Sequence, residues 1–267
     1  MIHYTERDLL DPNHSVEVHL VGAGGTGSLV LAELGRIDHA LRQLGHPGLH
    51  LTCFDPDEVS EANIGRQLFS PADIGENKAR ILVERVNRFY GLSWESRPRV
   101  YEERSSGVPK ILITAVDTAS ARIAIGNMFQ GIKENKRPYY WLDFGNRQND
   151  GQTILGTMQK IGQPDVSPSC SASRLATVIE MYPDLAQEDR SQDQGPSCSL
   201  GEALNRQDLF INRVVASFGC TILWKLFRNA RISVCGCFVN LESLRVNPLS
   251  VEHSAQFESV AKADQAA

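Results

Sequence analysis

Apolar residues in the first half of the chain follow two alternating spacings, one typical of strands and one typical of helices. Val16, Val18 and Leu20 recur at every second position, which predicts a strand that runs into the glycine-rich residues 22–27. Apolar residues then recur at steps of three and four, which predicts a helix whose buried face is formed by Val30, Leu34, Ile37, Leu41 and Leu44. Residues 45–48 end this helix, and a second strand runs from Leu49 to Asp55.

The alternation of helices and strands continues to residue 143. We predict a helix over about 78–90, a strand over 110–116, a helix over about 119–129 and a strand over 139–143. Residues 110–116 are nearly all apolar, as in a central strand that helices cover on both faces. This half of the chain therefore predicts an α/β fold with a Rossmann-like, doubly wound sheet of parallel strands.

The second half of the chain has a different pattern. Residues 152–158 predict a strand, but no helix follows it directly. Residues 162–200 are rich in Pro, Ser, Gln and Asp, and they predict a long polar surface loop with one short helix near 175–181. A helix over about 208–227 and an antiparallel hairpin of strands 231–240 and 243–246 follow, and the tail after Val251 is expected to fray.

These patterns favour a single domain over residues 1–267. It comprises a nucleotide-binding core at 15–160, the long polar loop at 162–200, and a C-terminal helix and hairpin at 205–250. Antiparallel strands of the C-terminal half are expected to extend the parallel sheet.

Composition narrows the class of protein. The net charge is −5, from 27 Lys and Arg against 32 Asp and Glu, which argues against a nucleic-acid binder. No apolar run approaches the roughly 20 residues that a membrane helix needs, and the first residues lack the pattern of a secretion signal. These features favour a cytoplasmic protein, in which the six cysteines are mainly reduced thiols.

The glycine-rich residues 22–27 contain Gly22, Gly24, Gly25 and Gly27. Glycines between a strand and a helix let the backbone turn tightly and approach a ligand. The following helix then presents unpaired N–H groups and the positive end of its dipole, which suits a phosphate. The spacing also satisfies G-x-G-x-x-G, with Asp55 placed to bind a ribose, so this turn alone fits NAD and ATP equally well.

The next segment favours ATP. Arg66 can bind phosphate through its planar guanidinium, and Lys78 adds a compact positive charge at the start of a helix. A dehydrogenase needs no such pair of cations after its second strand. Asp117 follows the apolar strand 110–116, and a carboxylate in that position points into the ligand crevice of a parallel sheet. Asp117 is therefore the candidate magnesium ligand, and a helix N-cap is its alternative role.

Taken in order, these motifs resemble those of the ThiF/MoeB family of ubiquitin-activating-enzyme-like proteins. The family's G-x-G-G-x-G, D-x-D-x-V-x-x-x-N-x-x-R-Q, lysine and later strand-end Asp all occur here over residues 15–125. The resemblance implies that ATP and Mg²⁺ are used to adenylate the C-terminal carboxylate of a small protein. It also implies that Asp55 binds the ribose and that the phosphates are contacted by Asn63, Arg66, Gln67 and Lys78.

One residue departs from the family pattern. The family places Asn after the magnesium aspartate, and this chain has Thr118. A contact that the Asn amide makes would be weakened here or replaced by the hydroxyl. Thr118 therefore keeps open a catalytically silent, ThiF-like scaffold that binds a nucleotide or a partner, beside the alternative of an NAD-dependent oxidoreductase.

Some members of the family pass the acyl group to a cysteine. Cys198 lies near the end of the long polar loop, where the family's reactive cysteine falls, and Cys170 is the competing nucleophile. An incidental loop cysteine is an equally good interpretation of Cys198. Relatives often hold zinc through two C-x-x-C pairs, but this chain has no C-x-x-C, and the spacing of Cys235 and Cys237 argues against zinc.

Motifs in the second half resemble the ThiF-related proteins of bacterial PRTRC cassettes, namely residues 139–146, 151–156 and 196–199. This resemblance implies a ubiquitin-like partner with a C-terminal Gly, and it suggests a conjugating-enzyme-like partner as well. Relatives are homodimers in which an N-terminal arginine often reaches the other subunit's ATP. The usual R-Y-x-R-Q start is absent here, and Arg7 is only a weak substitute.

Overall fold

The computed structural model describes residues 1–65, 67–102, 107–164, 170–185 and 207–264, with side chains up to residue 257. Arg66 and Cys198, both singled out from the sequence, lie outside the described residues.

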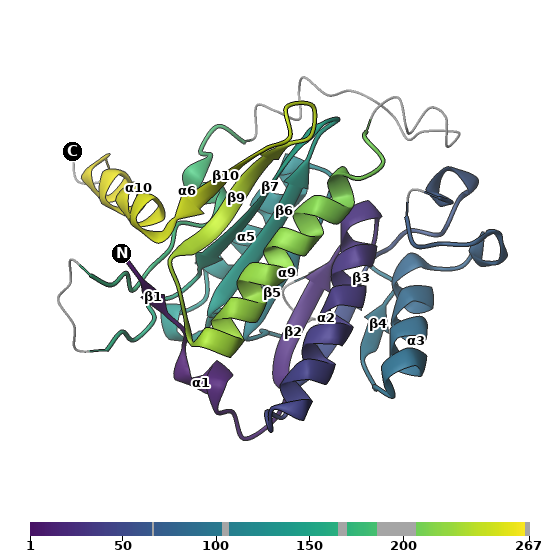
Figure 1. Ribbon diagram of the computed structural model, residues 1–267, viewed down its shortest axis with the longest axis horizontal. Coiled ribbons are helices and arrows are strands. Elements are labelled where there is room, and N and C mark those ends of the chain that lie inside the picture. The colour runs from purple at the N-terminus through teal and green to yellow at the C-terminus, as the bar shows by residue number, and fades with distance from the viewer. Residues whose placement is uncertain (66, 103–106, 165–169, 186–206, 265–267) are drawn as a thin grey trace.

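A mixed eight-stranded sheet, in the order β10-β9-β7-β6-β5-β2-β3-β4, forms the centre of the fold (Figure 1). Its parallel part consists of β2 (Val16–Val21), β3 (Leu49–Phe54), β4 (Glu95–Arg97), β5 (Ile111–Thr114) and β6 (Tyr140–Asn146). Its antiparallel part consists of β7 (Asp150–Thr157), β9 (Val234–Asn240) and β10 (Arg245–Ser250). The predicted fold class, a parallel sheet extended by antiparallel strands, is confirmed.

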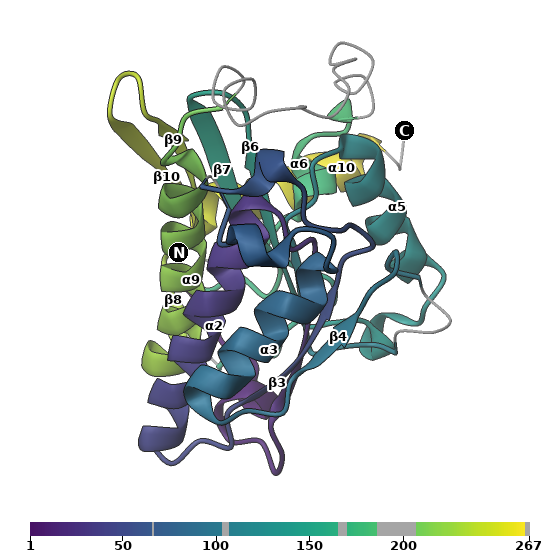
Figure 2. The ribbon, with the colours of Figure 1, turned by 90° about the vertical axis from the view of Figure 1, so that its right-hand side faces the viewer.

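Helices cover both faces of this sheet (Figure 2). One face carries α2 (Gly25–Gln43), α3 (Lys78–Tyr90) and α9 (Ile211–Asn229). On the other side lie α5 (Ala119–Gln130), α6 (Val178–Met181) and α10 (Val251–Asp264). Helix α9 packs on α2 and on both β6 and β7, so a single helix spans the junction between the parallel and antiparallel strands.

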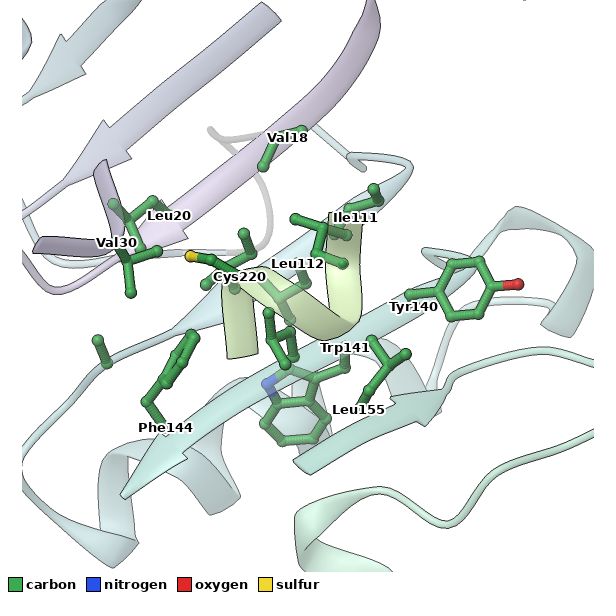
Figure 3. Packing of buried hydrophobic residues seen from close by; sticks show 14 of the residues in the cluster. Val18, Leu20, Val30, Ile111, Leu112, Tyr140, Trp141, Phe144, Leu155 and Cys220 are labelled. Atoms are coloured by element: carbon green, nitrogen blue, oxygen red, sulfur yellow. The ribbon is translucent and has the colours of Figure 1, made fainter. Parts of the chain in front are cut away.

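The core lies between these layers. Figure 3 shows Trp141 and Phe144 of β6 packed with residues of β5, β2 and α9. The largest fully buried side chains include Trp141, Tyr140, Phe54 and Phe144. Leu44, expected on the buried face of its helix, is 58% exposed because α2 ends at Gln43.

Short elements complete the chain. A two-stranded antiparallel sheet joins β1 (His3–Tyr4) to β8 (Arg231–Ile232). The remaining short helices are α1 (Arg7–Leu10), η1 (Glu61–Asn63), η2 (Pro71–Asp73) and η3 (Glu134–Lys136). Among the described residues, none of the helices is long and apolar enough to cross a membrane.

The tail after Val251 was expected to fray, and this prediction is wrong for the residues up to 264. Residues 251–264 form α10, in which Val251 and Ser254 are fully buried. The Ser254 hydroxyl accepts a hydrogen bond from the backbone N–H of Ala176 (2.9 Å). Leu175 is likewise fully buried, so this part of the expected surface loop packs into the fold.

Candidate functional site

The glycine-rich turn, residues 22–27, connects β2 to α2. Gly22 has φ +94°, and a Cβ there would lie 2.5 Å from the carbonyl oxygen of Ala115 at the end of β5. A Cβ on Gly27 would collide with the carbonyl oxygen of Gly22. Both positions therefore require glycine, Gly22 because it is pressed against the chain at the end of β5 and Gly27 because it is pressed against Gly22.

The glycine-rich turn is open where it leads into the first residues of α2. Gly24 is the N-cap of the helix and contributes no side-chain cap. Within the described chain, a Cβ on Gly24 would meet no atom within 4 Å. This open space in front of helix N–H groups and the positive end of the dipole fits a phosphate.

Asp55 follows β3 and is nearly buried, with 5% exposure. Its carboxylate accepts hydrogen bonds from the N–H groups of Ala23 (2.6 Å) and Asp57 (2.8 Å). Burial raises the pKa of Asp55, and these hydrogen bonds and the charge of Lys78 partly offset the rise. Asp55 therefore fixes the glycine-rich turn, a structural role that the ribose prediction did not include. Its carboxylate oxygens can still accept a ribose hydroxyl.

Lys78 is the first residue of α3 and is largely buried. Its Nζ lies 2.8 Å from Asp57 Oδ2, and its backbone N–H donates a hydrogen bond to the carbonyl group of Asp57 (3.0 Å). Asn77 caps the helix and donates to the carbonyl groups of Asp55 and Asp57. These contacts hold the Lys78 charge beside Asp55 and hence close to the glycine-rich turn.

Asn63 and Gln67 have more local surroundings than the sequence suggested. Asn63 Oδ1 accepts hydrogen bonds from the N–H (2.9 Å) and the hydroxyl (3.1 Å) of Ser60, so this oxygen caps η1. Gln67 is 8% exposed, and its Oε1 has no hydrogen-bond partner in the part of the chain that the structure describes. Their predicted contacts with phosphate stay predictions.

Asp117 follows β5, which lies on the opposite side of β2 from β3 and Asp55. Strand β5 pairs in parallel with β2, and the N–H of Ala115 bonds to the carbonyl of Val21 (2.9 Å). Asp117 follows two residues later and is exposed. Its alternative role as a helix N-cap is wrong, because Thr118 caps α5 by accepting a hydrogen bond from the N–H of Ala121.

Asp117 also lines a cleft of about 400 Å³. The walls of the cleft come from α5, the β6–β7 turn and strands β9 and β10. Polar side chains dominate its lining, including those of Asn146, Arg147, Asp150 and Asn240. The sequence analysis missed this cleft, because it depends on which antiparallel strands become neighbours.

An amide network joins the cleft to the start of α2. Asn212, on the first turn of α9, is 2% exposed, and its Oδ1 accepts hydrogen bonds from Thr26 Oγ1 (2.8 Å) and Asn146 Nδ2 (2.5 Å). Asn212 Nδ2 donates to Gln207 (3.0 Å). A lone Asn at the start of an apolar helix was the available sequence signal, and the analysis did not use it.

The cysteines differ in exposure. Cys170 is exposed, whereas Cys53, Cys220, Cys235 and Cys237 are buried. Burial raises the pKa of Cys220 to about 12 and that of Cys235 to about 11, so neither thiol is poised as a nucleophile near neutral pH. Among the described residues, no group of three or more His, Cys, Asp or Glu side chains could hold a metal. Magnesium needs only one or two protein carboxylates, so this finding does not bear on Asp117.

Arg7 lies far from the glycine-rich turn of its own chain. Helix α1 contacts the region just after α2, where His46 Nε2 donates to the carbonyl of Leu9 (2.9 Å). Helix α2 has 19 residues, so it separates this contact from the turn by about 28 Å at 1.5 Å per residue. Arg7 does not serve its own site, and its donation to a second subunit stays a prediction.

The sequence model of the ThiF family matches residues 4–256 of the chain. A comparison with curated proteins finds no sequence match.

Solved structures share the fold at low sequence identity. Escherichia coli MccB is similar with a TM-score of 0.60 and 14% identity over 92% of this chain and 64% of the MccB chain. A structure of E. coli MccB with ATP gives a TM-score of 0.58 and 13% identity, over 92% and 65% of the two chains. PaaA gives a TM-score of 0.55 and 13% identity, over 88% of this chain and 64% of that of PaaA. The chain thus spans less than two thirds of the length of MccB, and at these identities the likeness shows the fold.

Proposed function

Because the chain belongs to the ThiF family, we propose that it uses ATP and Mg²⁺ to adenylate the C-terminal carboxylate of a small ubiquitin-like protein. The observation that carries this proposal is the arrangement around the glycine-rich turn. The turn follows β2, Lys78 is held beside the segment after β3, and Asp117 follows β5, with β2 lying between the other two strands. A turn that suits phosphate therefore has a cation on one side and an exposed carboxylate on the other.

ATP would place its phosphates in the open space at the start of α2, in front of Gly24. Lys78 supplies positive charge there, and the sequence pattern adds Arg66, Asn63 and Gln67. Asp55 would accept a ribose hydroxyl while its other contacts hold the turn. The structure of MccB with ATP supports a nucleotide in this fold.

The donor chemistry of the site also fits magnesium. Asp117 is an exposed carboxylate at the carboxyl end of a central strand, and Mg²⁺ prefers one or two such hard oxygen ligands together with phosphate and water. When bound, the ion would neutralise charge on the ATP phosphates during the transfer.

The cleft beside Asp117 is the proposed place for the substrate's C-terminal tail. Its polar side chains can bond to the peptide groups of an extended chain, and Asp117 and Asn146 bring one part of it next to the nucleotide site. MccB has been solved with MccA, which supports a polypeptide substrate in this fold.

The reaction that this arrangement supports is acyl activation. An oxygen of the substrate carboxylate attacks the α-phosphorus of ATP and forms a new P–O bond. The bond from that phosphorus to the β-phosphate bridging oxygen breaks, so the products are an acyl-adenylate and pyrophosphate. No general base is needed, because the attacking carboxylate is already ionised at neutral pH. Lys78 and the N–H groups of α2 would stabilise negative charge on the phosphates.

Pyrophosphate exchange tests this proposal. The chain is mixed with Mg·ATP, labelled pyrophosphate and the proposed substrate, a small ubiquitin-like protein with a C-terminal glycine. We expect Asp117→Ala to abolish exchange. The control is Asp8→Asn, which alters an exposed aspartate on α1, at the end of α2 remote from the turn, and should leave exchange unchanged.

Two outcomes would replace the proposal. Thermal stabilisation by NAD with none by Mg·ATP would favour an oxidoreductase. Binding of Mg·ATP without exchange would favour a silent scaffold.

The further steps are proposed from the sequence resemblance. Transfer to Cys198 predicts a partner conjugate that dithiothreitol cleaves and that Cys198→Ala lacks, with Cys170→Ala as the matched comparison. Persistence of the conjugate in Cys198→Ala would remove Cys198 from the mechanism. A homodimer, a conjugating-enzyme-like partner and membership of a PRTRC cassette belong to the same proposal.

A further inference from the structure

Arg122 of α5 lies in a buried set of polar contacts that the proposed mechanism does not use. Its side chain is only 10% exposed, and its Nε lies 3.1 Å from each carboxylate oxygen of Asp143. One terminal nitrogen donates to the carbonyl groups of Val116 (2.7 Å) and Phe144 (2.8 Å). The guanidinium thus ties the end of β5 to the end of β6.

Asp143 is itself fixed from the opposite side. It is 1% exposed, and its Oδ1 accepts a hydrogen bond from Thr114 Oγ1 (2.5 Å). The same hydroxyl accepts a hydrogen bond from the indole N–H of Trp141 (2.7 Å), which lies in the core (Figure 3). A buried ion pair is costly to desolvate, so it adds little net stability but orders the groups that it contacts.

The ordered groups adjoin the magnesium candidate. Val116 is the residue directly before Asp117, and Thr118, directly after it, is the N-cap of α5. The exposed Asp117 therefore sits in a short connection that Arg122 holds at its preceding carbonyl. Arg122 and Asp117 also line the same cleft.

We propose that Arg122 is a positioning residue. It fixes the backbone before Asp117 and so orients the Asp117 carboxylate toward the magnesium–nucleotide complex. This inference rests on the proposed function. Lysine cannot take over the role, because one ammonium group cannot reproduce the planar set of bonds to Asp143, Val116 and Phe144.

The first test is Arg122→Lys, with Arg42→Lys as its matched control. Arg42 likewise pairs through Nε with a buried aspartate, Asp38, at 2.8 Å, but near the far end of α2. Binding of ATP is titrated at rising Mg²⁺ and, separately, in EDTA. We expect Arg122→Lys to raise the half-saturating Mg²⁺ about tenfold, as for loss of a group that orients a metal ligand. Affinity in EDTA and all values for Arg42→Lys should stay near wild type.

A second measurement needs no nucleotide. Hydrogen exchange of peptides covering residues 113–121 should be about tenfold faster in Arg122→Lys, the effect of losing about one hydrogen bond. A general loss of stability would instead raise exchange across the whole chain. If Arg122→Lys fails to fold, Asp143→Asn replaces it in both measurements. This variant keeps the shape of the network and the two bonds from Arg122 to backbone carbonyl groups, so the rises in half-saturating Mg²⁺ and in exchange rate should be smaller.

The outcomes separate the two proposals. Wild-type protein that binds no Mg·ATP would overturn the proposed function and this inference with it. If the wild-type protein binds Mg·ATP, two results would overturn only the role of Arg122. One is a half-saturating Mg²⁺ that is unchanged in Arg122→Lys, and the other is an equal rise in Arg42→Lys.

Discussion

Two glycines of the same turn give a sharp test of the nucleotide site, because a methyl group meets different surroundings at each. At Gly24 the added Cβ would find no atom of the described chain within 4 Å. At Gly27 it would meet the carbonyl oxygen of Gly22, which is itself pressed against Ala115. The same chemical change should therefore affect ligand binding at one position and folding at the other.

The expected stabilities follow from this geometry. Overpacking against backbone costs about 1–3 kcal/mol, and each kcal/mol lowers the melting temperature of a chain near this size by about 2–4 °C. Gly27→Ala should therefore lower the melting temperature by several degrees. At Gly24 the added methyl group meets no atom of the described chain, so Gly24→Ala should change the melting temperature less than Gly27→Ala does.

For the affinity for Mg·ATP, the larger effect is expected at Gly24. A methyl group on Gly24 occupies the space proposed for phosphate, so Gly24→Ala should weaken Mg·ATP binding at least tenfold, or about 1.4 kcal/mol. Calorimetric titration measures this affinity, and thermal unfolding without ligand measures stability. If Gly24→Ala binds Mg·ATP as wild type does, the phosphates do not lie at the start of α2. If Gly27→Ala melts as wild type does, the turn is not packed as described.

Two further predictions concern stability. Burial lowers the pKa of His3 and His19 from 6.5 to about 4. Between these two pH values the unfolded chain binds more protons than the folded chain, so the free energy of unfolding decreases as the pH falls from 6.5 to about 4. The loss is at most roughly 3 kcal/mol for each histidine, and urea unfolding of His3→Gln at pH 7 and 4.5 should show a smaller drop than wild type. Ser254→Ala leaves the buried N–H of Ala176 without its acceptor and should cost about 1–3 kcal/mol in the same assay; unchanged stability would mean that α10 does not dock there.

Local signals explain why some elements were predicted closely. The prediction of a helix over 78–90 matches α3, because Asn77 caps its start and Gly91, with φ 68°, ends it in the left-handed conformation. By contrast, β4 was missed, because Glu95, Ser96 and Arg97 show no apolar alternation at the edge of the sheet. Helix α10 was missed because a few small buried residues, rather than a broad apolar stripe, anchor it.

The candidate site divides in the same way. Lys78 and Asp117 could be placed near the glycine-rich turn, since the carboxyl ends of neighbouring parallel strands share one edge of a sheet. The N-cap role, given as the alternative for Asp117, belongs to Thr118, because both residues suit that position and only the backbone path decides between them. The Arg122–Asp143 pair was also beyond reach, because a sequence does not show which charges become buried together.

Trp141 gives the molecule a built-in optical probe. Its indole N–H bonds to the hydroxyl that also holds Asp143, so a shift in the connection before Asp117 would change the polarity around the ring. Replacing Trp94 and Trp224 by Phe would leave it as the sole tryptophan of the chain. Emission from that single fluorophore could then follow ligand-induced movement in stopped-flow experiments without any attached dye.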